Sequence, residues 1–191
     1  SDNPVASALT TPVIEAPVAA KVLTIVVPCH NEQDTVQAFY ATASAVAVKK
    51  LVPMGVAVRY VFVDDGSRDR TLEALRALDA MHPEVSYLSF SRNFGKEAAL
   101  FAGLAAAAKH SDLVAVMDAD LQDPPTLLPQ MVAKVLSGEY DRAAARRISR
   151  EGEPPIRSWF ARRFYSLMNH LTDLDLRDGA RDFSVMTRRF V

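Results

Sequence analysis

The chain of 191 residues has one cysteine, almost no net charge and no long hydrophobic run. With Cys29 alone, an internal disulfide is impossible, and a reducing compartment is expected. A formal net charge of −1 argues against a nucleic-acid-binding protein. No apolar run approaches the roughly 20 residues that a membrane-spanning helix needs. Residues 1–20 lack the basic start and apolar core of a secretory signal, so we expect an extended N-terminal arm there.

The whole chain has the composition of a globular protein, with 49% apolar and 24% charged residues, and we expect one domain over residues 21–191. Continuous runs rich in β-branched residues are typical of strands that are buried on both faces. The predicted strands are Val22–Val27, Val58–Val63, Val85–Phe90 and Leu113–Met117. Helices are predicted over about 32–49, 69–81 and 96–109, and from Pro125 to near Gly138. This alternation predicts an open α/β fold, with a mainly parallel sheet flanked by helices.

Polar segments follow each of the predicted strands. In chain order they read PCHNE, DDGSRDRT, SRNFGK and DADLQDPP. The carboxyl ends of parallel strands share one edge of a sheet, and ligands of open α/β sheets bind beyond that edge. The sequence therefore predicts a polar, acidic ligand site there.

The last of these segments places carboxylates unusually close together, at Asp118, Asp120 and Asp123. Like charges so near one another repel, which calls for a compensating cation. Asp118 and Asp120 suit a hard divalent cation that leaves room for water and substrate phosphates, and Gln122 offers a further oxygen. The alternative is a loop whose acids only cap the following helix, a role that we expect for Asp123.

The earlier segments allow two interpretations. Asp64 and Asp65 end a strand, where an acid can bind ribose hydroxyls or a base amide. They could equally form a turn with Gly66, in which Ser67 or Asp69 caps the next helix. Cys29 is interpreted as a small buried hydrophobic residue and, taken alone, His30 as a surface histidine.

Taken together, the segments VVPCHNE, VFVDDGSRDRT, SFSRNFGKEAALFAGL and VMDADLQDPP resemble those of family 2 glycosyltransferases of the GT-A fold. The chain is most similar to the polyprenyl-phosphate glycosyltransferases, which include dolichol-phosphate mannose synthases and bacterial undecaprenyl-phosphate sugar transferases. The similarity runs from about Val22 to the C-terminus, through RRISREGE, FYSLMNHLTDLDL and RDFSVMTRR.

The resemblance implies roles for individual residues. The residues that it places around the donor nucleotide are Pro28, His30, Glu32, Asp64, Asp65 and Asp118. Asp118, Asp120 and Gln122 should hold Mg²⁺ or Mn²⁺ against the diphosphate of a UDP- or GDP-linked sugar. Arg147 and Arg150 match basic positions near the donor and acceptor phosphates, where a guanidinium suits phosphate oxygens. The implied catalytic residues are Asp118, Asp120, Arg147 and Arg150.

Two departures from the family pattern stand near the C-terminus. Ser184 occupies a position where many relatives have Arg, and Arg181 one where Gly is common. Relatives also continue into transmembrane helices, so we expect the catalytic domain here to be truncated before them. The full-length protein is then expected at the cytoplasmic face of the membrane.

A basic block supports that location. Residues 142–163 carry seven Arg against two Glu, a balance of +5. A predicted helix over 156–171 has an apolar stripe, and Trp159 and its flanking Arg residues lie off the stripe. This arrangement suits a membrane interface or, equally, an ordinary solvated helix face.

The reaction implied by the resemblance is transfer of a sugar to a polyprenyl phosphate, with inversion at the anomeric carbon. Four alternatives stay open at this point: a family 2 enzyme with a sugar hydroxyl as acceptor, a non-catalytic nucleotide-binding module, a two-component receiver, and a phosphatase with Asp118 as nucleophile. A receiver should carry its acidic pair after the first strand, which here ends in PCHNE.

Overall fold

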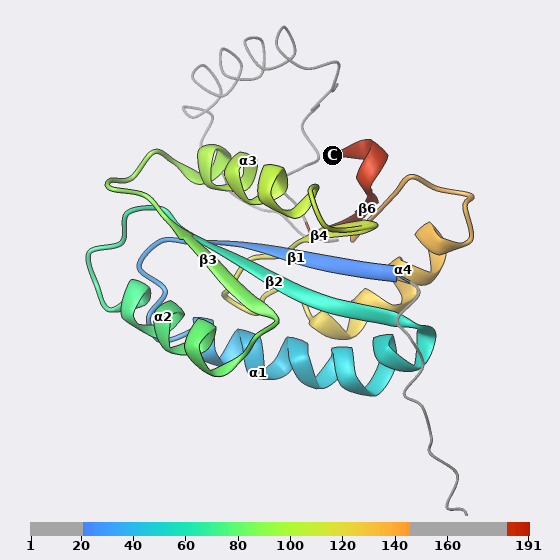
Figure 1. Cartoon of the computed structure of the whole chain (residues 1–191), viewed down its shortest axis with the longest axis horizontal. Helices are drawn as coiled ribbons and strands as arrows, with labels where there is room; N and C mark the ends of the chain where they lie inside the picture. The colour runs from blue at the N-terminus through green and yellow to red at the C-terminus, as the bar shows by residue number, and fades with distance from the viewer. Residues whose placement is uncertain (1–20, 146–182) are drawn as a thin grey trace, which may run out of the picture.

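The computed structural model describes residues 21–145 and 183–191, which form a six-stranded sheet covered by helices on both faces (Figure 1). The strands are β1 (Lys21–Cys29), β2 (Val56–Asp64), β3 (Val85–Ser89), β4 (Leu113–Val116), β5 (Arg142–Ala144) and β6 (Ser184–Thr187). The α-helices are α1 (Val36–Val46), α2 (Thr71–Met81), α3 (Lys96–Ala107) and α4 (Leu128–Leu136). Shorter helical turns are η1 (Ala47–Leu51), η2 (Val52–Met54), η3 (Pro125–Leu127) and η5 (Arg188–Phe190).

The sheet order is β3-β2-β1-β4-β6-β5. The pairs β1–β2, β1–β4 and β2–β3 are parallel, whereas β6 is antiparallel to both β4 and β5. The predicted mainly parallel α/β sheet is therefore confirmed, and β5 and β6 are strands that the sequence did not predict. Both strands are short, and they pair with each other although they lie far apart in the chain. A local sequence pattern therefore does not predict them.

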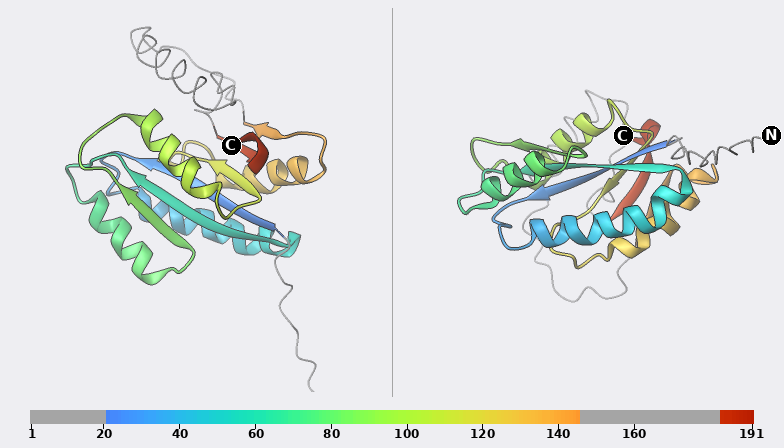
Figure 2. Two further views of the ribbon diagram at one scale, coloured as in Figure 1. Left: turned by 45° about the horizontal axis from the view of Figure 1, so that its top comes forward. Right: turned by 60° about the horizontal axis from the view of Figure 1, so that its bottom comes forward.

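The two faces of the sheet are covered by different helices. Helices α1, α2 and α4 lie on one face and α3 on the other (Figures 1 and 2). Successive side chains of β1 point to opposite faces of the sheet. Ile25 belongs to the core on the α1 side, and Val26 packs with Leu100 and Leu104 of α3 on the other. Burial on both faces explains why the strand sequences are continuously apolar.

The helix boundaries correct two sequence predictions. α1 begins at Val36 rather than near Glu32, so residues 30–35 form a loop above the sheet edge. Asp123 was predicted to cap the helix after it, and this is wrong: Pro124 itself occupies the N-cap of η3, and no side-chain hydrogen bond caps that turn. Within residues 21–145 and 183–191, no helix has the length and apolar character needed to cross a membrane.

Candidate functional site

The candidate site lies at the carboxyl edge of β1, β2, β3 and β4, where the four polar segments meet. Because these strands are parallel, their carboxyl ends lie at the same edge of the sheet. The chain leaves β1 toward β2 on one side, and β4 pairs with β1 on the other. Open α/β sheets bind their ligands at such a switch in strand order, here between β1 and β4.

The loop after β1 is fastened to the loops that follow β2 and β3. His30 Nδ1 lies 2.8 Å from the backbone carbonyl of Asp65, so Nδ1 carries the proton and donates it. The other ring nitrogen, Nε2, lies 3.2 Å from the side-chain amide nitrogen of Asn93. His30 thus bridges three loops while its side chain stays exposed, as predicted.

Asn31 provides a second link that the sequence analysis missed. Its φ of 56° lies in the left-handed region, which Asn tolerates better than most residues. Its N–H donates to Ser67 Oγ at 2.9 Å, and its Oδ1 accepts the N–H of Arg68 at 2.9 Å. Next along the chain, the N–H of Glu32 donates to Thr71 Oγ1 at 2.7 Å. The loops after β1 and β2 are therefore one hydrogen-bonded unit.

The two acids that end β2 are almost fully buried, at 2% exposure for Asp64 and 3% for Asp65. Asp64 accepts hydrogen bonds from the Ser67 N–H at 3.0 Å and the Ser89 hydroxyl at 2.9 Å. Asp65 accepts the N–H groups of Phe94 at 2.7 Å and Gly95 at 2.9 Å, one on each oxygen. Both carboxylates therefore hold loops together, and their contact with a nucleotide stays a prediction.

Gly66 allows the β2 and β3 loops to approach each other. Its φ is +62°, and a Cβ built on it would lie 2.2 Å from the carbonyl carbon of Arg92. Any side chain would collide with that backbone. The SRNFGK segment can therefore lie against the end of β2 because Gly66 has no side chain and tolerates a positive φ.

The acids after β4 are in a different environment. Asp118 lies two residues beyond the end of β4, after the buried Met117, and keeps 30% of its side chain exposed. Its two carboxylate oxygens lie 2.6 Å and 2.7 Å from Nζ of Lys96, the first residue of α3. The positive charge next to Asp118 in this structure is therefore that of Lys96, which the sequence analysis did not identify. Asp120 is exposed, and its Oδ1 accepts the N–H of Gln122 at 3.0 Å.

The pKa of Cys29, the last residue of β1, is affected by the acidic side chains at this edge of the sheet. Burial raises the pKa of its thiol, and the negative charges of Glu32, Asp64 and Asp118 raise it further. The thiol is therefore protonated and buried, which confirms the interpretation of Cys29 as a small hydrophobic residue. The edge of the sheet around it is strongly acidic.

The remaining site residues are only partly covered by the structure. Pro28 is buried within β1, in register with Val63 of β2, and the Glu32 carboxylate accepts the Thr35 hydroxyl at 2.6 Å. Arg147, Arg150, Arg181, Trp159 and the helix predicted over 156–171 lie outside the described residues. Ser184 is fully buried in β6 opposite Val116, and its hydroxyl has no hydrogen-bond partner among the described residues.

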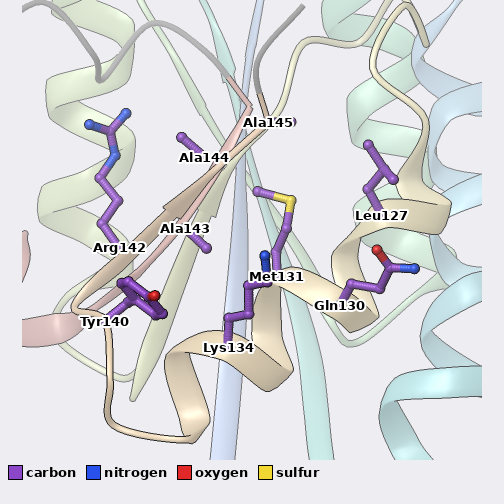
Figure 3. Close-up of a pocket in the computed structure, with 9 residues that line it drawn as sticks. All are labelled: Leu127, Gln130, Met131, Lys134, Tyr140, Arg142, Ala143, Ala144 and Ala145. Carbon is purple, nitrogen blue, oxygen red and sulfur yellow. The ribbon is translucent and has the colours of Figure 1, made fainter.

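A pocket of about 400 Å³ lies elsewhere, between α4 and β5 (Figure 3). Its lining consists of Leu127, Gln130, Met131, Lys134, Tyr140, Arg142, Ala143, Ala144 and Ala145. None of the predicted nucleotide or metal residues is among them. The candidate site is therefore defined by the strand-end loops and not by this pocket.

The sheet order and the acid pair after β4 fit the class of GT-A nucleotide-diphospho-sugar transferase folds, and the similarity to solved structures shows this fold. Two solved structures have this fold. A mannosyltransferase from Pyrobaculum calidifontis, in complex with GDP-Man and Mn²⁺, has a TM-score of 0.58 at 19% identity, covering 95% of this chain and 49% of that one. Glucosyl-3-phosphoglycerate synthase from Mycobacterium tuberculosis, in complex with UDP, has a TM-score of 0.58 at 23% identity, covering 92% and 60%.

The chain belongs to glycosyl transferase family 2, whose profile matches residues 24–191. The bactoprenol glucosyl transferase of Shigella phage SfV is 37% identical over 169 residues, which are 88% of this chain and 53% of that protein. The chain spans about half the length of the curated relatives that it matches. Family membership confirms the resemblance and disfavours the receiver and phosphatase hypotheses.

Proposed function

We propose that this chain is the catalytic domain of an inverting glycosyltransferase, which moves a sugar from a nucleoside diphosphate to a polyprenyl phosphate at the cytoplasmic face of the membrane. The observation that carries the proposal is the meeting of four polar loops at the β1/β4 switch, where the side chain of Asp118 is partly exposed. The relative named as a bactoprenol glucosyl transferase, at 37% identity, supports the lipid acceptor.

The nucleotide would lie over the unit formed by the loops after β1 and β2. Its base and ribose would contact the segment that holds Pro28, His30 and Glu32, with Asp64 and Asp65 beneath. His30 suits this role because its ring is exposed and its Nδ1–H is already engaged by the Asp65 carbonyl. The hydrogen bonds among the loops hold the site in shape before the donor arrives, which reduces the entropy lost on binding.

The residues after β4 fit a divalent metal of the Mg²⁺ or Mn²⁺ type. Among the described residues no three His, Cys, Asp or Glu side chains gather as a complete metal cage. Such a cage is not needed, because Mg²⁺ is commonly held by one or two carboxylates together with substrate phosphates and water. Asp118, Asp120 and Gln122 would supply the protein oxygens. Once bound, the metal would stabilise negative charge on the leaving diphosphate.

In the proposed reaction, an oxygen of the acceptor phosphate forms a bond to the anomeric carbon from the face opposite the donor. The bond between that carbon and the donor diphosphate breaks, and its electron pair leaves with the nucleoside diphosphate. The acceptor phosphate is already largely ionised near neutral pH, since its second pKa is about 6. It therefore needs little help from a general base, and in-line positioning carries most of the catalysis.

Arg147 and Arg150 would position the phosphates in this reaction. Both belong to the basic block of residues 142–163, which has a balance of +5. If they hold the acceptor, Arg147→Ala or Arg150→Ala should lower transfer even at saturating donor. If they hold the donor diphosphate, the same changes should mainly weaken donor binding.

The function is tested in two stages. First, the chain is melted with UDP, GDP and their sugars, with and without Mn²⁺; the true donor raises the melting temperature by linkage, and EDTA removes the shift. Second, that donor is offered with undecaprenyl phosphate in liposomes or with soluble sugars, using the full-length protein. Transfer to a soluble sugar with none to the lipid would reject the proposed acceptor. A melting temperature that no nucleotide shifts would reject the donor site.

A further inference from the structure

Lys96 reaches across the candidate site from a firmly held position. The two preceding residues, Phe94 and Gly95, are hydrogen-bonded through their N–H groups to the buried Asp65 at the end of β2. The Lys96 ammonium nonetheless contacts Asp118, at the end of β4. Since β1 lies between β2 and β4, Lys96 links the segments that follow β2 and β4 across the end of β1.

We propose, on the basis of the proposed function, that Lys96 is the resident counterion of Asp118 and moves to the donor diphosphate when a divalent metal binds. In the donor-free protein the ammonium takes the place of the metal. In the donor complex it becomes a diphosphate ligand.

The geometry makes the lysine and a metal competitors. Nζ lies 2.6 Å and 2.7 Å from the two oxygens of Asp118, so it covers both atoms through which that carboxylate could bind a metal. A divalent ion bonded to either oxygen, at about 2.0–2.2 Å, would lie close to the ammonium and repel it. Either the ammonium leaves or the metal binds weakly.

The side chain is able to leave. It is 42% exposed and carries its charge on a flexible stem, which allows the ammonium to change partner. A diphosphate arriving beside Asp118 would offer it a new anionic partner. A lysine is well suited to this exchange, because its compact charge and rotating donors bind a phosphate without one required orientation.

This exchange predicts that Lys96→Gln raises the affinity for the metal and lowers the affinity for the nucleotide. In Lys96→Gln, Asp118 loses its internal competitor, so Mn²⁺ alone should bind about tenfold more tightly. The same variant lacks the ammonium that would bind the diphosphate, so UDP or GDP at saturating Mn²⁺ should bind about tenfold more weakly. Each tenfold change corresponds to about 1.4 kcal/mol.

The experiment measures both affinities on the same preparations of the 191-residue chain. Free Mn²⁺ is followed by electron paramagnetic resonance in the absence of nucleotide, and UDP and GDP are titrated by calorimetry at saturating Mn²⁺. Lys109→Gln is the matched control: it removes the same charge from an exposed lysine just beyond the far end of α3. Lys96→Arg keeps the charge and should stay near the unchanged chain in both measurements. Circular dichroism melts show that each variant is folded.

Opposite shifts in Lys96→Gln, with Lys109→Gln unchanged, would support the proposal. No change in either affinity, or changes of the same sign, would overturn it while leaving the proposed function intact. If the unchanged chain itself shows no Mn²⁺-dependent nucleotide binding, the proposed function fails and this inference fails with it.

Discussion

The acids after β2 and the acids after β4 look alike in the sequence but differ in the structure. Asp64 and Asp65 are 2% and 3% exposed and accept hydrogen bonds from neighbouring loops. Asp118 keeps 30% of its side chain exposed and pairs with Lys96, and Asp120 is exposed. The comparison shows that the acids after β2 hold neighbouring loops together, whereas Asp118 and Asp120 are more exposed.

Strand order explains the difference. β2 lies between β1 and β3, so the loops after all three strands meet over its end and enclose its acids. β4 is flanked by β1 and by β6, which is antiparallel and contributes no carboxyl end at this edge. Among the described residues, Asp118 and Asp120 therefore meet fewer loops and stay more exposed than Asp64 and Asp65.

The largest loss of stability is expected from Asp65→Ala. Removing this carboxylate leaves the buried N–H groups of Phe94 and Gly95 without their acceptor, which should lower the free energy of unfolding by about 3 kcal/mol. Urea denaturation measures the change, with Asp120→Ala as the control at the exposed site. A loss below about 1 kcal/mol would show that Asp65 does not hold the loops together.

Gly66→Ala should be the next most harmful change. The new Cβ would have to occupy a left-handed φ of +62° only 2.2 Å from backbone atoms of Arg92, so the β3 loop must shift. We expect a loss of about 2 kcal/mol. Gly138→Ala is the matched control, because Gly138 also has a positive φ, of +78°, but no atom within 4 Å of its Cβ position. Equal losses in both variants would mean that backbone conformation, and not loop contact, sets the effect at Gly66.

Acid should destabilise the β2 loop by a smaller amount. Burial acts to raise the pKa of Asp69, but hydrogen bonds from Thr71 and from the Gln33 N–H outweigh it and lower that pKa. A group whose pKa is lowered on folding stabilises the protein above its unfolded pKa of about 4 and loses this stabilisation as the pH falls through the folded pKa. Stability measured from pH 6 to pH 3 should therefore fall less in Asp69→Asn than in the unchanged chain. Parallel curves would contradict this assignment.

The smallest effect on stability is expected from Asp120→Asn, at most about 0.5 kcal/mol, because the side chain is exposed. Its effect on ligand binding should be large. Nucleotide affinity in Mn²⁺ should fall at least about tenfold, a difference of about 1.4 kcal/mol, whereas affinity in EDTA should be low and equal in both proteins. Calorimetry provides both values. Equal affinities for the variant and the unchanged chain in Mn²⁺ would remove Asp120 from the metal site.

Local patterns in the sequence were enough to predict β1 to β4, the helices between them and the edge at which the polar segments gather. Continuous apolar runs identify strands buried on both faces, and parallel strands place their carboxyl ends together whatever their order. Helix starts were less accurate: Glu32 and Asp69 lie just before α1 and α2. Each accepts the backbone N–H of the first residue of the helix that follows it, and each is also hydrogen-bonded to the segment that follows the other strand. The strands β5 and β6 have only three and four residues and depend on pairing with distant segments.

The sequence by itself determined that acids, an imidazole and amides would follow the strands of a parallel sheet, because hydrophobic periodicity and strand ends are local properties. Only the tertiary structure decided which acids are buried against neighbouring loops and which stay partly exposed. The partners of Asp65 lie about thirty residues along the chain, at Phe94 and Gly95, and the partner of Asp118 lies at Lys96. Such pairs form because strand order brings particular loops together, and no pattern within one segment contains that order.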